Sequence, residues 1–382
     1  MAKKKLLFFS IFIIIILVFV LTIYNIIYKN NNIYLNNKDE APNFISIMLE
    51  ETASSGEYKV SKSNKWPSKG YVFNKEMSYC NNGSTLTWNE NDNSVSVNIN
   101  KTDKCYVYFD IYQPTQPTLA EYVKSQYTGT QGDNALYYHN STLTNGAGDN
   151  SYRYAGASDN VNNYICLGSD ATTCPDANLF RIIGVFGNQT KVIRAKSVGY
   201  QQWHTSESNT WSSSSLNAYL NGTYLTSLGT IAEKIATTTW KVGGGSGSNI
   251  SASVPATAYK NEVGSSASTT IIDKKIGLMY VSDYGFAASP SAWTKILGDY
   301  DGTDANGTSI KTINWMYMGY NEWTISRHSD NTNSAFFVNS TGNVLGSNVR
   351  SDNGVRPSFN LESSVKYVSG SGSMSDPVRV TD

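Results

Sequence analysis

Leu179-Phe-Arg-Ile-Ile-Gly-Val185 is the strongest strand signal in the sequence, and Lys191-Val-Ile-Arg-Ala195 follows it after a short polar break. Short apolar runs that are rich in β-branched and aromatic residues are typical of buried strands. The same pattern predicts three further strands, at residues 276–282, 335–338 and 355–361.

Helices are predicted at only a few places. Trp211-Ser-Ser-Ser-Ser-Leu-Asn-Ala-Tyr-Leu-Asn-Gly222 offers a serine N-cap and a terminal glycine, so we expect a helix over Ser213–Leu220. Thr118 and Glu121 form a capping-box pattern at the start of another short helix. Strands separated by a few helices and by long Gly-, Asn- and Ser-rich loops indicate an α+β domain, which we place at residues 120–382.

A smaller domain is predicted before it. Ser94-Val-Ser-Val-Asn-Ile99 alternates polar and apolar residues, and Cys105-Tyr-Val-Tyr-Phe-Asp-Ile111 alternates aromatic and aliphatic ones. This alternation is typical of strands with one buried face and predicts an all-β domain at residues 43–113. Pro114-Thr-Gln-Pro117 restricts the backbone and interrupts strand pairing, so residues 114–119 are the expected linker.

The four cysteines fall into two local pairs, Cys80 with Cys105 and Cys166 with Cys174. Four cysteines allow three connectivities, and the spacing favours the local pairs. A zinc site would need a Cys-x-x-Cys spacing or a nearby histidine. We predict two structural disulfides, which persist outside the reducing cytoplasm, and free thiols are the alternative.

The first thirty residues predict a membrane segment. Three lysines at positions 3–5 precede an apolar run over residues 6–27, and about 20 apolar residues cross the hydrocarbon core of a bilayer. The lysines predict a cytoplasmic N-terminus. We therefore expect a cytoplasmic stub and transmembrane helix at residues 1–30, a polar stalk at 31–42, and a single-pass protein of the cell membrane with extracellular C-terminal domains. A cleaved signal peptide is the alternative, although the run lacks a small-residue cleavage site.

Composition excludes one class of function. The 382 residues include 30 Lys and Arg and 30 Asp and Glu, and charged residues make up only 16%. Nucleic-acid binding requires a basic face on the protein, and a chain with zero formal net charge gives no sign of one. Aromatic residues reach 12%, which favours packed β-rich domains over disorder.

The order of several motifs resembles an uncharacterised domain in surface proteins of gut Bacillota and their wall-less relatives. Its motifs match residues 211–225, 276–285, 323–327 and 354–359, the last being Gly-Val-Arg-Pro-Ser-Phe. More distantly, the Trp-x-x-x-Arg strand and the terminal Gly-Val-Arg resemble the formylglycine-generating and C-type-lectin-like fold group. This resemblance implies a larger, C-type-lectin-like α+β domain in which Arg327 and Arg356 are structural. The reactive cysteine of the enzymes in that group has no counterpart after Cys174.

Aromatic side chains are the main candidates for ligand binding. Two tryptophans flank Met316-Tyr-Met-Gly-Tyr-Asn321, a denser cluster than one core strand needs. Aromatic faces stack on sugars, and neighbouring polar groups bond to hydroxyls, whereas burial in the core is the alternative. The ligand-binding candidates are Trp315, Tyr317, Tyr320, Trp323, His328 and Asp283.

Signals for catalysis are weaker. The histidines at positions 139, 204 and 328 are scattered, and the sequence has no Gly-x-Ser-x-Gly pattern. Asp283 and Glu322 are the acids that best fit a glycosidase pair, because Asp283 follows a predicted strand and Glu322 adjoins a tryptophan. We predict no catalytic residue and keep a cell-surface glycoside hydrolase using these two acids as an alternative.

Metal binding is predicted to be absent, with one open alternative. Asp299, Asp301 and Asp304 place oxygen ligands for Ca²⁺ in one loop. An EF-hand loop starting at Asp299 would need Gly at its sixth position and Glu at its twelfth, where the sequence has Asp304 and Ile310. An ordinary turn explains the same residues, and we expect no cofactor.

Together these patterns predict a membrane-anchored extracellular binding protein, an adhesin or glycan-binding module without catalysis. The expected partners are the membrane, through residues 6–27, and a glycan or surface protein. A structural envelope spacer is a further alternative.

Overall fold

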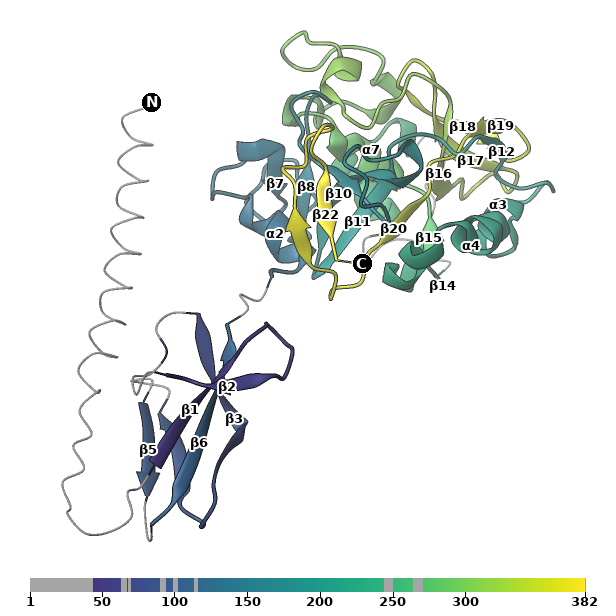
Figure 1. Cartoon of the computed structure of the whole chain (residues 1–382). Helices are drawn as coiled ribbons and strands as arrows, with labels where there is room; N and C mark the ends of the chain where they lie inside the picture. The colour runs from purple at the N-terminus through teal and green to yellow at the C-terminus, as the bar shows by residue number, and fades with distance from the viewer. Residues whose placement is uncertain are drawn as a thin grey trace. The chain divides into compact units, whose positions relative to one another are not determined.

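The computed structural model describes residues 44–62, 67, 70–89, 94–98, 102–112, 116–243, 250–263 and 271–381. The chain is a mixed α+β protein with many strands and few helices (Figure 1). It divides into two compact units between Thr115 and Gln116.

The first unit is built on a four-stranded sheet in the order β2-β1-β6-β3. Its first and last strands, β1 and β6, lie side by side and run parallel. Alternate residues of β6 face the core, where Cys105, Val107 and Phe109 are buried. The strands of this unit are β1 (Phe44–Glu50), β2 (Tyr58–Val60), β3 (Tyr71–Cys80), β6 (Lys104–Ile111) and the separate hairpin β4 (Thr85–Asn89) and β5 (Ser94–Asn98).

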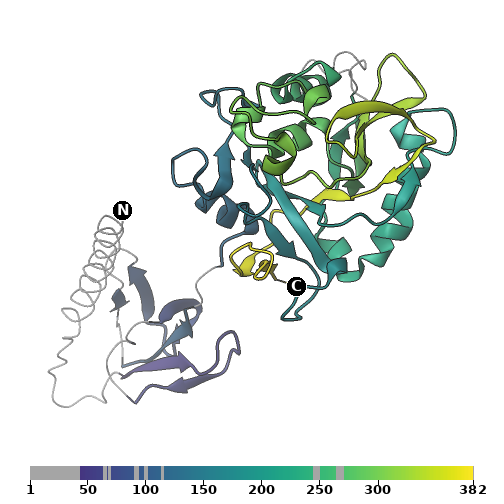
Figure 2. The same ribbon diagram turned by 90° about the horizontal axis from the view of Figure 1, so that it is seen from above.

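The second unit contains a nine-stranded sheet around the antiparallel pair β10 and β11. Seven of the eight residues of β10 are buried, which accounts for an apolar sequence that only Arg181 interrupts. Figure 2 shows this sheet from above, with helical segments around it. Its strands are β7 (Leu136–Tyr138), β8 (Tyr152–Tyr154), β9 (Tyr164–Cys166), β10 (Leu179–Phe186), β11 (Gln189–Arg194), β15 (Ile276–Gly277), β20 (Ser358–Asn360), β21 (Tyr367–Ser369) and β22 (Val378–Val380).

A five-stranded sheet and a two-stranded ribbon complete the strands described in this unit. The sheet comprises β12 (Tyr200–Gln202), β16 (Glu322–Arg327), β17 (Ser334–Val338), β18 (Val344–Asn348) and β19 (Asp352–Gly354), and the ribbon pairs β13 (Thr238–Lys241) with β14 (Ile271–Lys274). The α-helices that the structure describes in this unit are α2 (Leu119–Ser125), α3 (Ser215–Tyr219), α4 (Leu225–Ser227), α6 (Pro255–Glu262) and α7 (Val281–Ala287).

Two local predictions differ from the observed elements. The predicted helix over Ser213–Leu220 is α3, which begins after a Ser214 cap and continues through a π-helical turn. The strand expected at residues 276–282 is only Ile276–Gly277, and helix α7 begins at Val281. Asp283 therefore lies in a helix, where its carboxylate accepts a hydrogen bond from the Tyr280 backbone N–H.

The first residues of the second unit pair with the segment that leads into its C-terminal hairpin. The Leu119 N–H donates to the Val365 carbonyl, and the Tyr367 N–H donates to the Pro117 carbonyl. The rings of Tyr122 and Tyr367 stack with centroids 3.7 Å apart. Strand β22 also pairs in parallel with β9, so the C-terminal hairpin is part of the main sheet.

The predicted disulfides are confirmed. Cys80 pairs with Cys105 across β3 and β6, and Cys166 pairs with Cys174 in the loop after β9. The first bridge reinforces a unit whose hydrophobic core contains few buried residues.

The predictions of a transmembrane helix and of a single-pass membrane localisation are corrected. In the part of the chain that the structure describes, no helix is long and apolar enough to span a bilayer. The longest described α-helix, α6, has 8 residues, against the roughly 20 that a crossing needs. The stub and helix expected at residues 1–30, and the stalk at 31–42, lie outside the described residues.

Candidate functional site

The two tryptophans proposed as ligand contacts belong to the core. Trp315 is 2% exposed and Trp323 is fully buried. The indole N–H of Trp315 donates to the Tyr154 carbonyl at 2.9 Å, and that of Trp323 donates to the Gln201 carbonyl at 2.9 Å. Their faces therefore pack against the protein and cannot stack on a ligand, which corrects that prediction.

The other three candidates of this region are partly buried and engaged in local contacts. The Tyr317 hydroxyl donates to the Ser340 carbonyl at 2.6 Å, and the Tyr320 ring packs against Gly354. The His328 ring stacks on Phe336 with centroids 4.2 Å apart. These contacts hold the loop and strand β16 in place.

Glu322 and Arg356 form a buried ion pair. The Arg356 Nε lies 2.5 Å from one carboxylate oxygen of Glu322, and another guanidinium nitrogen lies 2.9 Å from the second. Arg356 also donates to the Met316 carbonyl at 2.8 Å, which is the structural position that the resemblance implied. Arg327 is half-buried and donates to the Val242 carbonyl at 3.3 Å. A carboxylate engaged on both oxygens by one arginine is poorly suited to general acid–base catalysis.

Asp283 is the sequence candidate that lines a cavity. The cavity has a volume of about 170 Å³ and lies where α6, α7 and β13 meet the nine-stranded sheet. We call it the aromatic cavity, and its lining residues are Arg153, Phe186, Lys191, Thr238, Thr239, Trp240, Tyr259, Val263, Tyr280, Ser282, Asp283 and Asn360.

Alternating charges form one side of the aromatic cavity. The Lys191 Nζ lies 2.5 Å from Oδ2 of Asp283, and an Arg153 guanidinium nitrogen lies 3.5 Å from Oδ1. Arg153 also pairs with Asp149 at 2.6 Å and donates from Nε to the Ser151 hydroxyl. Arg153 reaches this position because β8 approaches β10 closely at Gly184, where an added Cβ would lie 2.1 Å from the Tyr152 carbonyl oxygen.

Aromatic rings surround the charged groups. The Lys191 Nζ lies 4.5 Å from the ring centroid of Tyr280, 5.4 Å from that of Trp240 and 5.7 Å from that of Phe186. The Trp240 ring covers Gly277, where any side chain would collide with it. Cations over aromatic faces are stabilised electrostatically when water is excluded. Burial lowers the pKa of the Lys191 ammonium, and the Asp283 carboxylate opposes that shift.

Glu262 is a second buried carboxylate near Asp283. It ends α6 and accepts hydrogen bonds from the Val281 and Ser282 backbone N–H groups, each at 2.9 Å, and from the Ser326 hydroxyl. Burial raises the pKa of Glu262, and the Asp283 charge adds to the shift, whereas the Ser282 and Ser326 hydrogen bonds oppose it.

One buried polar atom at the aromatic cavity, Oδ1 of Asn360, has no hydrogen-bond partner within the described residues, and Asn360 as a whole is 9% exposed. The Ser282 hydroxyl, in a residue that is 1% exposed, interacts with the Glu262 carboxylate and lowers its pKa. The Asn360 amide nitrogen donates to the Thr238 hydroxyl at 3.0 Å, which orients the unpaired oxygen as an acceptor. Unpaired buried polar groups are costly, so they point to a ligand that bonds to them.

Sequence reasoning identified Asp283 and missed the groups around it. Arg153, Lys191 and Glu262 lie on β8, β11 and α6, and long-range packing brings them together. The available signal was the lysine in Lys191-Val-Ile, because a buried strand rarely contains a charge without a partner.

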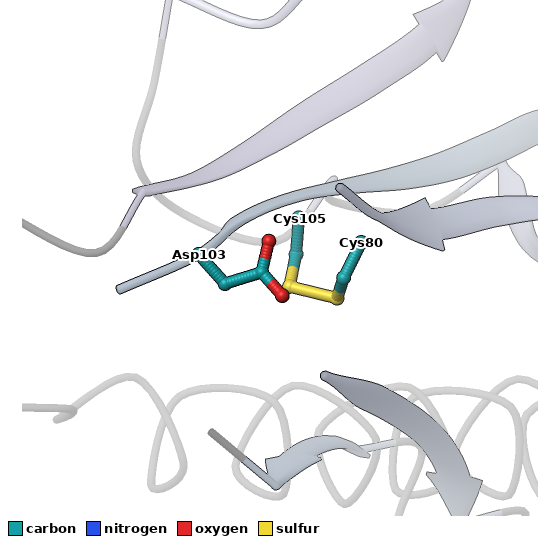
Figure 3. A group of neighbouring side chains, drawn as sticks. All are labelled: Cys80, Asp103 and Cys105. Carbon is teal, nitrogen blue, oxygen red and sulfur yellow. A yellow bond between two sulfur atoms is a disulfide. The ribbon is translucent and has the colours of Figure 1, made fainter. Parts of the chain in front are cut away.

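The structure brings together a group of possible metal ligands other than Asp299, Asp301 and Asp304. Among the described residues, the one group of three possible ligands is Cys80, Asp103 and Cys105 (Figure 3). Its sulfur atoms are bonded to each other, which removes the thiolates that a metal would bind. Burial opposes ionisation of Asp103, but hydrogen bonds from Ser84 and the Asn82 and Lys104 N–H groups lower the pKa of its carboxyl to about 2.

The carboxylates proposed for Ca²⁺ do not form such a group. Asp304 accepts hydrogen bonds from the Asn306 and Thr308 backbone N–H groups, at 2.9 and 2.8 Å, which is the geometry of a capped turn. Ca²⁺ binding by Asp299, Asp301 and Asp304 stays the alternative to the predicted absence of a metal.

Comparison with known proteins gives one family match. Residues 187–363 match the family model described as a domain of unknown function (DUF6273). The matched segment contains Lys191, Glu262 and Asp283 but not Arg153. No curated protein and no solved structure matches the chain.

Proposed function

We propose that the second unit is a non-catalytic binding domain that takes one sugar residue, or a ring of similar size, into the aromatic cavity. The observation that carries this proposal is the unpaired, buried Oδ1 of Asn360, which lies in a cavity lined by several aromatic side chains. Binding pockets for small molecules are mostly apolar with a few oriented polar groups.

The chemistry of a sugar fits these groups. Its C–H faces pack on rings such as Phe186 and Tyr259, which are only partly buried, and its hydroxyl groups can donate to Oδ1 of Asn360. A volume of about 170 Å³ is below the roughly 300 Å³ of common ligand pockets. The proposed ligand is therefore a single ring, such as the end of a glycan chain.

The acids support binding over the hydrolase alternative. Asp283 is held by Lys191 and Arg153, and Glu322 is held by Arg356. Glu322 is not among the residues that line the aromatic cavity. The pair proposed for hydrolysis is thus divided between two separate ion-pair networks.

Glycan-array screening of the full chain, followed by calorimetric titration of the best ligand, tests the proposal. Val263→Phe adds volume at the cavity wall and should abolish binding. Asn360→Leu removes one hydrogen bond to the ligand, worth about 1 kcal/mol, and should weaken binding roughly fivefold. Leu345→Phe, at an exposed position of β18, is the control and should bind normally.

Two results would contradict the proposal. Absence of binding to any glycan would favour the structural spacer. If Val263→Phe left glycan binding unchanged, the ligand would have to bind elsewhere. The effect of Tyr317→Phe would then test whether it binds at residues 316–321.

A further inference from the structure

Lys191 and Asp283 are in contact inside the second unit although 92 residues separate them in sequence. Nζ lies 2.5 Å from Oδ2, and the two side chains are 6% and 2% exposed. Lys191 belongs to β11 and Asp283 to α7, so the contact joins the main sheet to a helix.

The surroundings of this pair exclude water from the Lys191 amine. The rings of Tyr280, Trp240 and Phe186 replace water around the amine. Removal of water penalises both charges, and the lowered pKa of Lys191 follows from that burial. A proton that moves along the 2.5 Å contact turns the ion pair into a neutral amine and a neutral carboxylic acid. These are the forms in which an amine attacks a carboxyl carbon.

A neighbouring cation matches the needs of that attack. Addition to Cγ would place negative charge on Oδ1, which lies 3.5 Å from the Arg153 guanidinium. A fixed cation at a developing oxyanion lowers the barrier.

We propose that Lys191 and Asp283 form an intramolecular amide cross-link. The Lys191 nitrogen bonds to Cγ of Asp283, and the bond from Cγ to Oδ2 breaks. Oδ2 leaves as water, with the carboxyl proton and one amine proton, while Oδ1 remains as the amide carbonyl oxygen. The step is a condensation and requires no oxidant or cofactor. It is independent of the proposed glycan binding.

The chain contains a matched control for the proposed cross-link. Lys196 and Asp176 lie 2.6 Å apart, close to the distance in the buried pair, but their side chains are 57% and 64% exposed. Water stabilises both charges there. The same residue types at nearly the same distance should therefore remain an ordinary ion pair.

Mass spectrometry of the full chain, denatured and with its disulfides reduced, tests the inference directly. The chain should be lighter than its sequence mass by one water molecule. A protease digest should contain a branched peptide that joins Lys191 to Asp283 and none that joins Lys196 to Asp176. Lys191→Arg should restore the full mass.

The wild-type measurement decides the question even where a variant fails to fold. A chain of full mass, with Lys191 and Asp283 in separate unmodified peptides, would overturn the inference. Loss of water located at Asp301-Gly302, with Lys191 free, would overturn it equally. Neither result would bear on whether the aromatic cavity binds sugars.

Discussion

Glu322→Gln removes the counter-ion of a buried guanidinium while keeping the shape of the side chain. The Arg356 side chain is fully buried and that of Glu322 is 2% exposed, with Nε and Oε1 2.5 Å apart. Removal of one partner from a buried ion pair costs about 3–5 kcal/mol, because the other charge is left without compensation. We expect the free energy of unfolding of the second unit to fall by that amount.

An exposed pair supplies the control. Arg350 and Glu207 lie 3.4 Å apart with side chains 56% and 51% exposed, and such pairs contribute about 0–1 kcal/mol. Glu207→Gln should therefore change the free energy of unfolding little. Combining Glu322→Gln with Arg356→Met removes both charges and should recover most of the lost stability.

Urea unfolding of the full chain, followed by tryptophan fluorescence, measures these differences. Six of the eight tryptophans are buried in the second unit and report on its unfolding: Trp203, Trp211, Trp240, Trp293, Trp315 and Trp323. If Glu322→Gln cost no more than Glu207→Gln, the structural role assigned to this pair would be wrong. The same holds if the double variant were as unstable as the single one.

Three further perturbations address the histidine, the disulfides and the core. Burial holds the pKa of His139 well below its ordinary value of 6.5, so below pH 6.5 the unfolded chain takes up a proton that the folded chain does not. The free energy of unfolding should therefore decrease as the pH is lowered below 6.5. An equal decrease in the His139→Leu variant would refute this cause. Replacing both Cys166 and Cys174 by Ser should cost about 2–3 kcal/mol in urea unfolding, against about 3–4 kcal/mol for Cys80 and Cys105, and the reverse order would contradict the loop-length argument. Trp323→Ala should destabilise the second unit by about 3–5 kcal/mol without changing glycan affinity in the folded protein. Weaker glycan binding under conditions where the variant is fully folded would show that Trp323 belongs to the binding site.

Features set by neighbouring residues were predictable from the sequence. The capping box at the start of α2 forms as the pattern predicts, since the Thr118 backbone N–H donates to the Glu121 carboxylate and the Glu121 N–H donates to the Thr118 hydroxyl. Both disulfides follow from cysteine spacing. These features depend on a few residues and are insensitive to the packing of distant elements.

Features set by distant contacts were not predictable in the same way. Trp315 and Trp323 lie in a sequence whose composition suits an exposed aromatic surface. In the structure, however, their indole N–H groups donate to backbone carbonyls of β8 and β12, which are far away in the sequence. The apolar residues 276–282 suit a strand or a buried helix equally, and the Asp283 cap at Tyr280 decides for α7. The side chains around Asp283 lie on β8, β11 and α6, and only the packing of these elements brings them next to it.

The pairing of Pro117 and Leu119 with the C-terminal hairpin has a practical consequence. Because segments from its two ends pair with each other, we expect that residues 116–381 can be inserted into a surface loop of a host protein. Joining these ends with a short linker and opening the chain at another exposed turn would give a circular permutant with the same sheet order.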